Sequence, residues 1–152
     1  MLTVPKNSKI ICISKGSTMA AAKELMTEKR IRHLPVVDES HRIFAMLSKQ
    51  DLNDELKYHD MPVDLFASYP IHFVSVETPI SSVALKMVSE KISALILSNE
   101  KNEAVGIMTT DDLLFQFASL LQEKEKTDFS WKNFDALATA GELMKKLSDV
   151  GI

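Results

Sequence analysis

Two short motifs in the sequence pair a hydroxyl side chain with a carboxylate three residues later, Ser48-x-x-Asp51 and Thr109-x-x-Asp112. At the start of a helix this spacing forms a capping box, in which both side chains bond backbone N–H groups. A helix start also offers unpaired N–H groups and a partial positive charge, which suit a phosphate. Because a carboxylate repels phosphate, the two aspartates are better placed to accept hydrogen bonds from sugar hydroxyls. The spacing leaves capping and ligand binding open, and the two roles are compatible.

A group of cations accompanies only the first motif: Lys29, Arg30, Arg32, His33 and Lys49. Cationic side chains make charge-assisted hydrogen bonds to phosphate oxygens, so this group could hold a polyphosphate. The alternative is that the cations lie in solvent and complement the dipole at a helix end. The residue types alone do not separate these roles.

Other site chemistry has little support in the sequence. The four histidines, His33, His41, His59 and His72, are scattered without metal-ligand spacing. The single cysteine, Cys12, cannot form an intramolecular disulfide, and its apolar strand predicts an inert core thiol. No nucleophile elbow, phosphate-binding P-loop or catalytic pair of carboxylates occurs. We expect no metal ligand and no catalytic residue.

Composition places the chain among ordinary globular proteins. It has 152 residues, 45% apolar and 26% charged, and its 18 basic and 21 acidic residues give a net charge of −3. This balance predicts no general attraction to nucleic acid or anionic lipid. No apolar stretch approaches the roughly 18 residues of a membrane span, and residues 1–9 do not resemble a signal peptide. We therefore expect a cytoplasmic protein.

The two motifs belong to an internal repeat. A shift of 61 residues places Ser48 on Thr109 and Asp51 on Asp112, and it aligns about forty positions without a gap. The repeat predicts two copies of one unit, residues 8–58 and 69–122. A unit of about 50 residues buries too little surface to be stable alone, so the two are expected to pack together.

Apolar runs and turn residues predict the order strand, helix, strand, strand, helix in each copy. In the first copy these are a strand at 10–13, a helix from Ser17 to near Lys29, and a hairpin of 34–37 and 43–47. The second copy repeats them with a strand at 71–74, a helix from Thr78 to near Glu90 with Pro79 at its first position, and a hairpin of 94–97 and 104–108. The last helix begins at Ser48 in the first copy and at Thr109 in the second. The link 57–68 is expected to hold a short helical turn.

Two segments carry a family resemblance. Arg30–Asp38 reads RIRHLPVVD, and Gly106–Leu113 reads GIMTTDDL, with Gly-x-x-Thr-x-x-Asp between a strand and a helix. Together with the repeat, they resemble a tandem pair of cystathionine-β-synthase (CBS) domains over about 110 residues of the chain. The resemblance implies an α/β fold of two β-α-β-β-α repeats related by a pseudo-two-fold axis. It also implies a regulatory module that binds AMP, ADP, ATP or S-adenosylmethionine, with no further cofactor, and that often forms a homodimer.

The resemblance assigns roles to particular residues. Asp51 and Asp112 would bind ribose, and Ser48 and Thr109 would lie towards phosphate or ribose. Arg32 and Lys49 could contact phosphate, and Gly106 belongs to the second motif. The adenine slot would be lined by Ile11, Leu34, Pro35 and Val36 in the first copy, and by His72, Leu95 and Ile96 in the second. For all of these adenine-slot residues except His72, plain core packing is the alternative.

The copies differ from each other and from the family pattern. Ala45 stands where the family has Gly, so its methyl group would either crowd a ligand or fill space, and Ile96 stands where Pro is usual. Ser93 and Ala94 replace the cations Arg32 and His33, so a phosphate in the second copy would need cations from elsewhere. We expect at most one strong site per chain, in either copy.

Residues 127–152 lie outside the resemblance and predict a C-terminal helical tail. Phe134, Leu137, Met144 and Leu147 give it an apolar stripe. The stripe fits packing on its own CBS pair, on a second subunit or on a partner protein, and the sequence does not separate these.

The sequence thus favours a non-enzymatic module that senses an adenosine-containing ligand in the cleft between paired repeats and signals to an unidentified effector protein in trans. Two alternatives remain. One is a ligand-free dimeric scaffold in which Asp51 and Asp112 are only caps, and the other is a small α/β enzyme with an unrecognised site.

Overall fold

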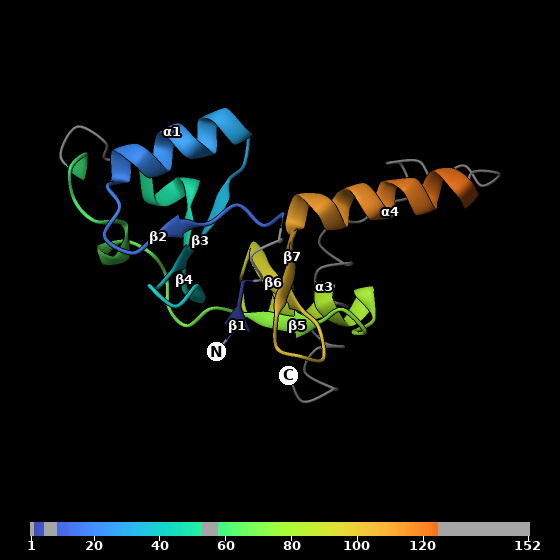
Figure 1. Cartoon of the computed structure of the whole chain (residues 1–152). Helices are drawn as coiled ribbons and strands as arrows, with labels where there is room; N and C mark the ends of the chain where they lie inside the picture. Colours follow the sequence, from blue (N-terminus) through green and yellow to red (C-terminus); the bar gives the residue numbers. More distant parts are fainter. Residues whose placement is uncertain (1, 5–8, 53–57, 125–152) are drawn as a thin grey trace. The chain divides into compact units, whose positions relative to one another are not determined.

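The computed structural model describes residues 2–4, 9–52 and 58–124 (Figure 1). The elements in chain order are β1 (Leu2–Thr3), β2 (Ile13–Ser14), α1 (Met19–Lys29), β3 (His33–Val37), β4 (Arg42–Ser48), the 3-10 turns η1 (Lys49–Leu52) and η2 (Val63–Leu65), β5 (Phe73–Ser75), α3 (Ile80–Ser89), β6 (Ala94–Ser98), β7 (Ala104–Thr109) and α4 (Thr110–Lys124). Contacts group the strands, α1, η1 and η2 into one compact unit, and α3 with α4 into another. The order strand, helix, strand, strand, helix is confirmed, and the described part of the last helix in the first copy is the 3-10 turn η1.

The first sheet has the strand order β1-β4-β3-β2. β3 and β4 form an antiparallel hairpin, as predicted, while β2 runs parallel to β3 with Ile13 opposite Val36. The helix α1 makes the crossover between these parallel strands. β1 was not predicted, and it pairs antiparallel with β4, placing Leu2 opposite Ile43.

The second sheet has the order β5-β6-β7, and β5 runs parallel to β6. With α3 between β5 and β6 and α4 after β7, it repeats the element order of the first sheet. The chain is an α/β protein made of two such repeats.

The core of the first copy lies between α1 and its sheet. Met19, Ala22 and Met26 are buried at helical spacing on α1, as the sequence predicts, and they pack in one cluster with Leu34 and Val36 of β3. A second cluster joins strands of both sheets: Leu2, Val37, Ile43, Ile96 and Ala104. Hydrophobic burial on both sides of β3 holds the end of β4, where the first motif begins.

The two copies share backbone details that the sequence alone did not indicate. Arg30, the residue after α1, and Lys91, the second residue after α3, both have a left-handed backbone with φ of 54°. The N–H of Ile31 donates to the carbonyl of Met26 in the last turn of α1 at 3.0 Å. The N–H of Ile92 donates in the same way to the carbonyl of Met87 in α3, also at 3.0 Å. Both helices therefore end on the same backbone hydrogen bond, and in α3 the hydroxyl of Ser89 also donates to the carbonyl of Lys86 at 3.1 Å.

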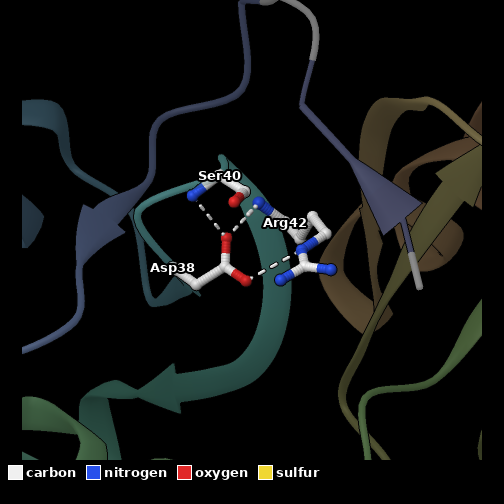
Figure 2. A network of polar contacts seen from close by, with 3 residues as sticks. All are labelled: Asp38, Ser40 and Arg42. Carbon is white, nitrogen blue, oxygen red and sulfur yellow. Dashed lines mark hydrogen bonds and ion pairs between the residues drawn. The ribbon is translucent and has the colours of Figure 1, made fainter.

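The hairpin turns of the two copies are equivalent as well. In the first, Oδ1 of Asp38 accepts from the backbone N–H groups of Ser40 and Arg42 at 2.9 Å, and Oδ2 accepts from the Arg42 guanidinium at 2.9 Å (Figure 2). In the second, Oδ1 of Asn99 accepts from the N–H groups two and four residues later at 3.0 Å. The backbone hydrogen bonds, led by that from Arg42, hold the pKa of Asp38 below its ordinary value.

Several predicted element boundaries are wrong. The first strands are shorter than expected, because ladder pairing begins only at Ile13 and Phe73. The cap of α1 is Thr18, whose Oγ1 accepts from the N–H of Ala21 at 3.2 Å, and not Ser17. Pro79 is itself the N-cap of α3, so no side chain caps that helix. The predicted helix ends and the helical turn in the link agree with α1, α3 and η2. The predicted tail lies outside the described residues.

Candidate functional site

The first motif lies where β4 ends and η1 begins. The backbone N–H and the hydroxyl of Ser48 both donate to Oδ2 of Asp51, at 2.7 and 2.8 Å. Both residues are half-buried. The capping geometry predicted from the spacing is therefore present, with Asp51 bonding the backbone at the turn.

The second motif has the same geometry where β7 passes into α4. The N–H and hydroxyl of Thr109 donate to Oδ2 of Asp112 at 2.8 and 2.6 Å. Here the N–H of Asp112 also donates back to Oγ1 of Thr109 at 3.2 Å, which completes a reciprocal capping box. Thr109 is half-buried and Asp112 is exposed.

In both motifs one carboxylate oxygen does all the capping. Oδ2 accepts two hydrogen bonds, while Oδ1 of Asp51 and of Asp112 accepts none within the described part of the chain. An ionised carboxylate has acceptor sites on both oxygens. In each motif the hydrogen bonds to Oδ2 hold the carboxylate in place, and Oδ1 can accept from an external hydroxyl or amine.

The residues expected to line an adenine slot fall into two groups. Leu34, Pro35, Val36, Leu95 and Ile96 are fully buried and belong to the core. Ile11 and His72 are half-buried, and the carbonyl of His72 accepts from the N–H of Ile96 at 2.9 Å. Any contact of the buried group with a ligand must come from its backbone.

The glycine position of the family pattern is occupied differently in the two copies. Ala45 is fully buried in the core cluster, so its methyl group fills space. At Gly106 an added methyl group would lie 3.4 Å from Cδ1 of Leu97, an ordinary contact distance. Neither copy needs glycine here for backbone geometry.

The cations of the first copy surround a surface pocket of about 500 Å³. Its lining residues are Lys23, Met26, Thr27, Arg30, Ile31, Arg32, Lys49 and Leu52. Lys29, which the sequence grouped with these cations, instead contacts Glu28 at 2.6 Å. Sequence reasoning missed Lys23, although it stands three and four residues before Met26 and Thr27, on the same side of α1.

Asp51 lines a different and much smaller cavity of about 20 Å³, together with Tyr58 and His59. A space of this size holds about one water molecule. An apolar groove of about 490 Å³ lies further along β4, lined by Leu2, Ile43, Phe44, Tyr69, Pro70, Ile71 and Phe73. Phe44 is four residues from Ser48, or about 13 Å along a strand, which is longer than the span from ribose to base in a nucleoside. Neither Ser48 nor Asp51 is among the residues that line this groove.

Other chemistry is limited within the described residues. Burial raises the pKa of the Cys12 thiol to about 11, so it stays protonated near neutral pH. Cys12 precedes β2 rather than lying within a strand, contrary to the prediction. The described residues contain no group of three metal-ligating side chains. Among the helices of the described segments, none is long and apolar enough to cross a membrane.

Comparison with known proteins identifies relatives of this arrangement. The family model described as "CBS domain" matches residues 5–58 and 63–119. Homoserine O-acetyltransferase of Methanococcoides burtonii is 26% identical over 105 residues, which is 69% of this chain and 22% of the relative. The chain thus spans about a fifth of the length of the curated relatives it matches.

Solved structures share the fold at low sequence identity. The CBS domain pair of protein MJ0100, in complex with 5′-methylthioadenosine and S-adenosyl-L-methionine, has a TM-score of 0.66 and 22% identity, covering 79% of this chain and 99% of that one. The CBS domain of a bacterial CNNM/CorC family Mg²⁺ transporter, in complex with ATP, has a TM-score of 0.64 and 23% identity, covering 72% and 80%.

Proposed function

Because this chain belongs to the CBS-domain family, we propose that it is a regulatory module that binds an adenosine-containing ligand of the AMP, ADP or ATP type. Asp51 and Asp112 would accept hydrogen bonds from the ribose hydroxyls, one at each motif. Ser48 and Thr109 would hold these carboxylates in place. The domain boundaries 8–58 and 69–122 are part of this proposal.

The observation that carries the proposal is that the two oxygens of each carboxylate have different hydrogen-bond partners. Oδ2 is fixed by two hydrogen bonds from the neighbouring hydroxyl residue, so the side chain needs little further ordering when a ligand arrives. Oδ1 is left to accept from a ribose diol. The complexes of related domain pairs with S-adenosyl-L-methionine and with ATP support this class of ligand.

The proposed module has no catalytic activity of its own. Ligand binding would favour one packing of the two repeats, and an effector protein with different affinities for the two states would respond to that shift. The effector is a separate protein or a further part of a longer protein. The module works as a homodimer in this proposal.

Calorimetric titration with AMP, ADP, ATP and S-adenosylmethionine tests the proposal. We expect saturable binding of at least one ligand to the wild type, and its loss in Asp51→Ala or Asp112→Ala, whichever removes the occupied site. Thr18→Ala is the matched control, because it also removes a helix cap, outside both motifs. Binding that survives in the double variant, or equal loss in Thr18→Ala, would contradict the assignment.

A second candidate, a ligand-free dimeric scaffold, is favoured by the exposed face of α4. Leu113 is buried, but Phe117 and Leu120 follow it on the same side of the helix and are 50% and 48% exposed. A second copy of the chain would bury these side chains. Sedimentation velocity of Phe117→Ser, with Gln116→Ser as a control, tests this: only the former should dissociate a dimer. A dimer in both variants would contradict the role of this face.

A further inference from the structure

The helices α1 and α3 occupy equivalent places in the two repeats, but they are not equally covered at their starts. The shift of 61 residues places Met87 on Met26, and both side chains are buried. It also places Ile80 on Met19, yet Met19 is 5% exposed and Ile80 is 40% exposed. Within the described residues, the start of α3 therefore lacks a cover that the start of α1 has.

The start of α1 is covered by the link that joins the two repeats. The N–H of Met19 donates to the carbonyl of Met61 at 2.9 Å, and the N–H of Ala20 donates to the carbonyl of His59 at 3.0 Å. Val63 is fully buried in the same core cluster as Met19. The link thus provides acceptors for N–H groups that have no partner inside the helix, and it buries the first apolar side chain of α1.

No equivalent contacts occur at the start of α3 within the described part of the chain. Pro79 is the N-cap and makes no side-chain hydrogen bond, and no described residue accepts from the N–H groups of Ile80 and Ser81. In the first repeat the link follows η1, whereas in the second repeat α4 continues to Lys124. The segment equivalent to the link is therefore the chain after α4, which leads into the C-terminal tail.

The tail repeats the apolar pattern of the link. In both segments apolar residues stand at positions i, i+2 and i+5. These are Met61, Val63 and Phe66 in the link, and Phe129, Trp131 and Phe134 in the tail. The link presents this pattern to the core of the first repeat, since Val63 and Phe66 pack in the cluster of Met19. The two segments are offset by 68 residues, which is the repeat length of 61 plus about two helical turns.

The chain after α4 is long enough to return to the start of α3. In the first repeat η1 ends at Leu52, and its equivalent Leu113 lies in α4, which runs on from there to Lys124 for about 17 Å at 1.5 Å per residue. The residues from Lys124 to Phe129 span about 17 Å when they are extended. The chain can therefore return to the level of Leu113 before the repeated apolar pattern begins.

We propose that residues 129–137 of the tail dock over the start of α3 as the link docks over the start of α1. In this arrangement the N–H groups of Ile80 and Ser81 donate to tail carbonyls, and the aromatic side chains of the tail bury Ile80. The occupant is the chain's own tail, because the link makes the same contact within one chain and the tail carries the same apolar spacing. The inference needs no ligand and is independent of the proposed function.

A docked tail would also cover the second hydroxyl–carboxylate motif. In the first repeat, Tyr58 and His59 of the link line a small cavity together with Asp51, and Asp51 is half-buried. In the second repeat Asp112 is exposed. Docking and release of the tail would therefore change the access of solvent and of any ligand to Asp112.

Trp131 is the only tryptophan of the chain, so its fluorescence reports on the proposed contact. In the full chain we expect acrylamide to quench Trp131 several-fold less than it quenches N-acetyltryptophanamide, because docking shields the indole ring from solvent. This protection should be the same at micromolar and nanomolar protein, since the contact is intramolecular. Protection lost on dilution would show that a second copy holds the tail, and full quenching of the wild type would show an undocked tail. Either result would overturn the proposal.

Paired variants test where the tail docks. Phe134→Asp should raise quenching to the level of free tryptophan, whereas Asn133→Asp adds the same charge outside the repeated spacing and should behave like the wild type. Ile80→Asp should have the same effect as Phe134→Asp. Its control is Val88→Asp, because Val88 is 50% exposed near the other end of α3. A carboxylate is favourable at a helix start, so Ile80→Asp should keep α3, and circular dichroism checks this.

Two further measurements complete the test. The double variant Ile80→Asp/Phe134→Asp should be quenched no more than either single variant, because both substitutions break one contact. Hydrogen exchange of peptides that span Thr109–Asp112 should become faster in Phe134→Asp and not in Asn133→Asp. Protection of Trp131 that survives Ile80→Asp would place the tail elsewhere and overturn the proposal. Unchanged exchange at the motif would overturn its proposed cover.

Discussion

Removing the capping carboxylate should destabilise the two repeats unequally. Each substitution deletes the acceptor for one N–H and one hydroxyl, but Asp51 is half-buried, whereas Asp112 is exposed to solvent. A helix cap contributes about 1 kcal/mol, within a range of about 0.5–2. A buried donor left without an acceptor adds to that cost. We therefore expect a loss of about 1.5–2 kcal/mol for Asp51→Ala and about 0.5–1 kcal/mol for Asp112→Ala.

Urea denaturation followed by circular dichroism measures these losses. Thr18→Ala, which deletes a single bond to the N–H of Ala21, should lose about 1 kcal/mol. Gln50→Ala is the near-neutral control, because this exposed residue lies inside the first motif without capping it. Equal losses at Asp51 and Asp112, or losses no greater than that of Gln50→Ala, would refute the capping geometry as the source of stability.

Three further predictions concern single side chains. Asp38→Asn should keep the hairpin turn but lose the ion pair with Arg42. Because folding lowers the pKa of Asp38, the wild type should lose its advantage in free energy of unfolding over the variant as pH falls below the ordinary pKa of 3.8. Urea titrations of both proteins at pH 7 and pH 3 measure this difference. Gly106→Ala should change stability by less than about 0.5 kcal/mol, because its methyl group meets Leu97 at an ordinary distance, and a larger loss on denaturation would contradict that packing. Cys12 should react with iodoacetamide at pH 8 more slowly than free cysteine, since its pKa is about 11, and an equal rate would show an exposed thiolate.

The sequence predicted what depends on local pattern. The apolar spacing of Met19, Ala22 and Met26 defined the buried face of α1, and the hydroxyl–carboxylate spacing defined both capping turns. Adjacent hydroxyls at Ser17 and Thr18 are equivalent in pattern, so only the extended backbone at Thr18 decides which one caps the helix.

What the sequence missed depends on partners distant along the chain. β1 has two residues and exists through pairing with β4, about forty residues later, so no local periodicity reveals it. The first strands begin only at Ile13 and Phe73, although their parallel partners β3 and β6 start two or three residues before the paired positions, so the apolar runs at 10–13 and 71–74 overstate the paired length. Lys23 lines the cationic pocket because of how α1 is rotated about its axis relative to the end of β4. The order of charged residues along the sequence does not give this rotation.

The central claim, that a spare aspartate oxygen binds a ribose diol, is tested most directly by deleting one ribose hydroxyl. The measurement compares the tightest-binding nucleotide of the panel with its 2′-deoxy form, in the wild type and in Asp51→Ala and Asp112→Ala. A hydrogen bond to a charged group contributes about 1.5–3 kcal/mol, so the wild type should bind the 2′-deoxy form about tenfold or more weakly. That preference should vanish in the variant of the occupied site. Equal binding of the two forms by the wild type, or a preference that survives both substitutions, would contradict the claim.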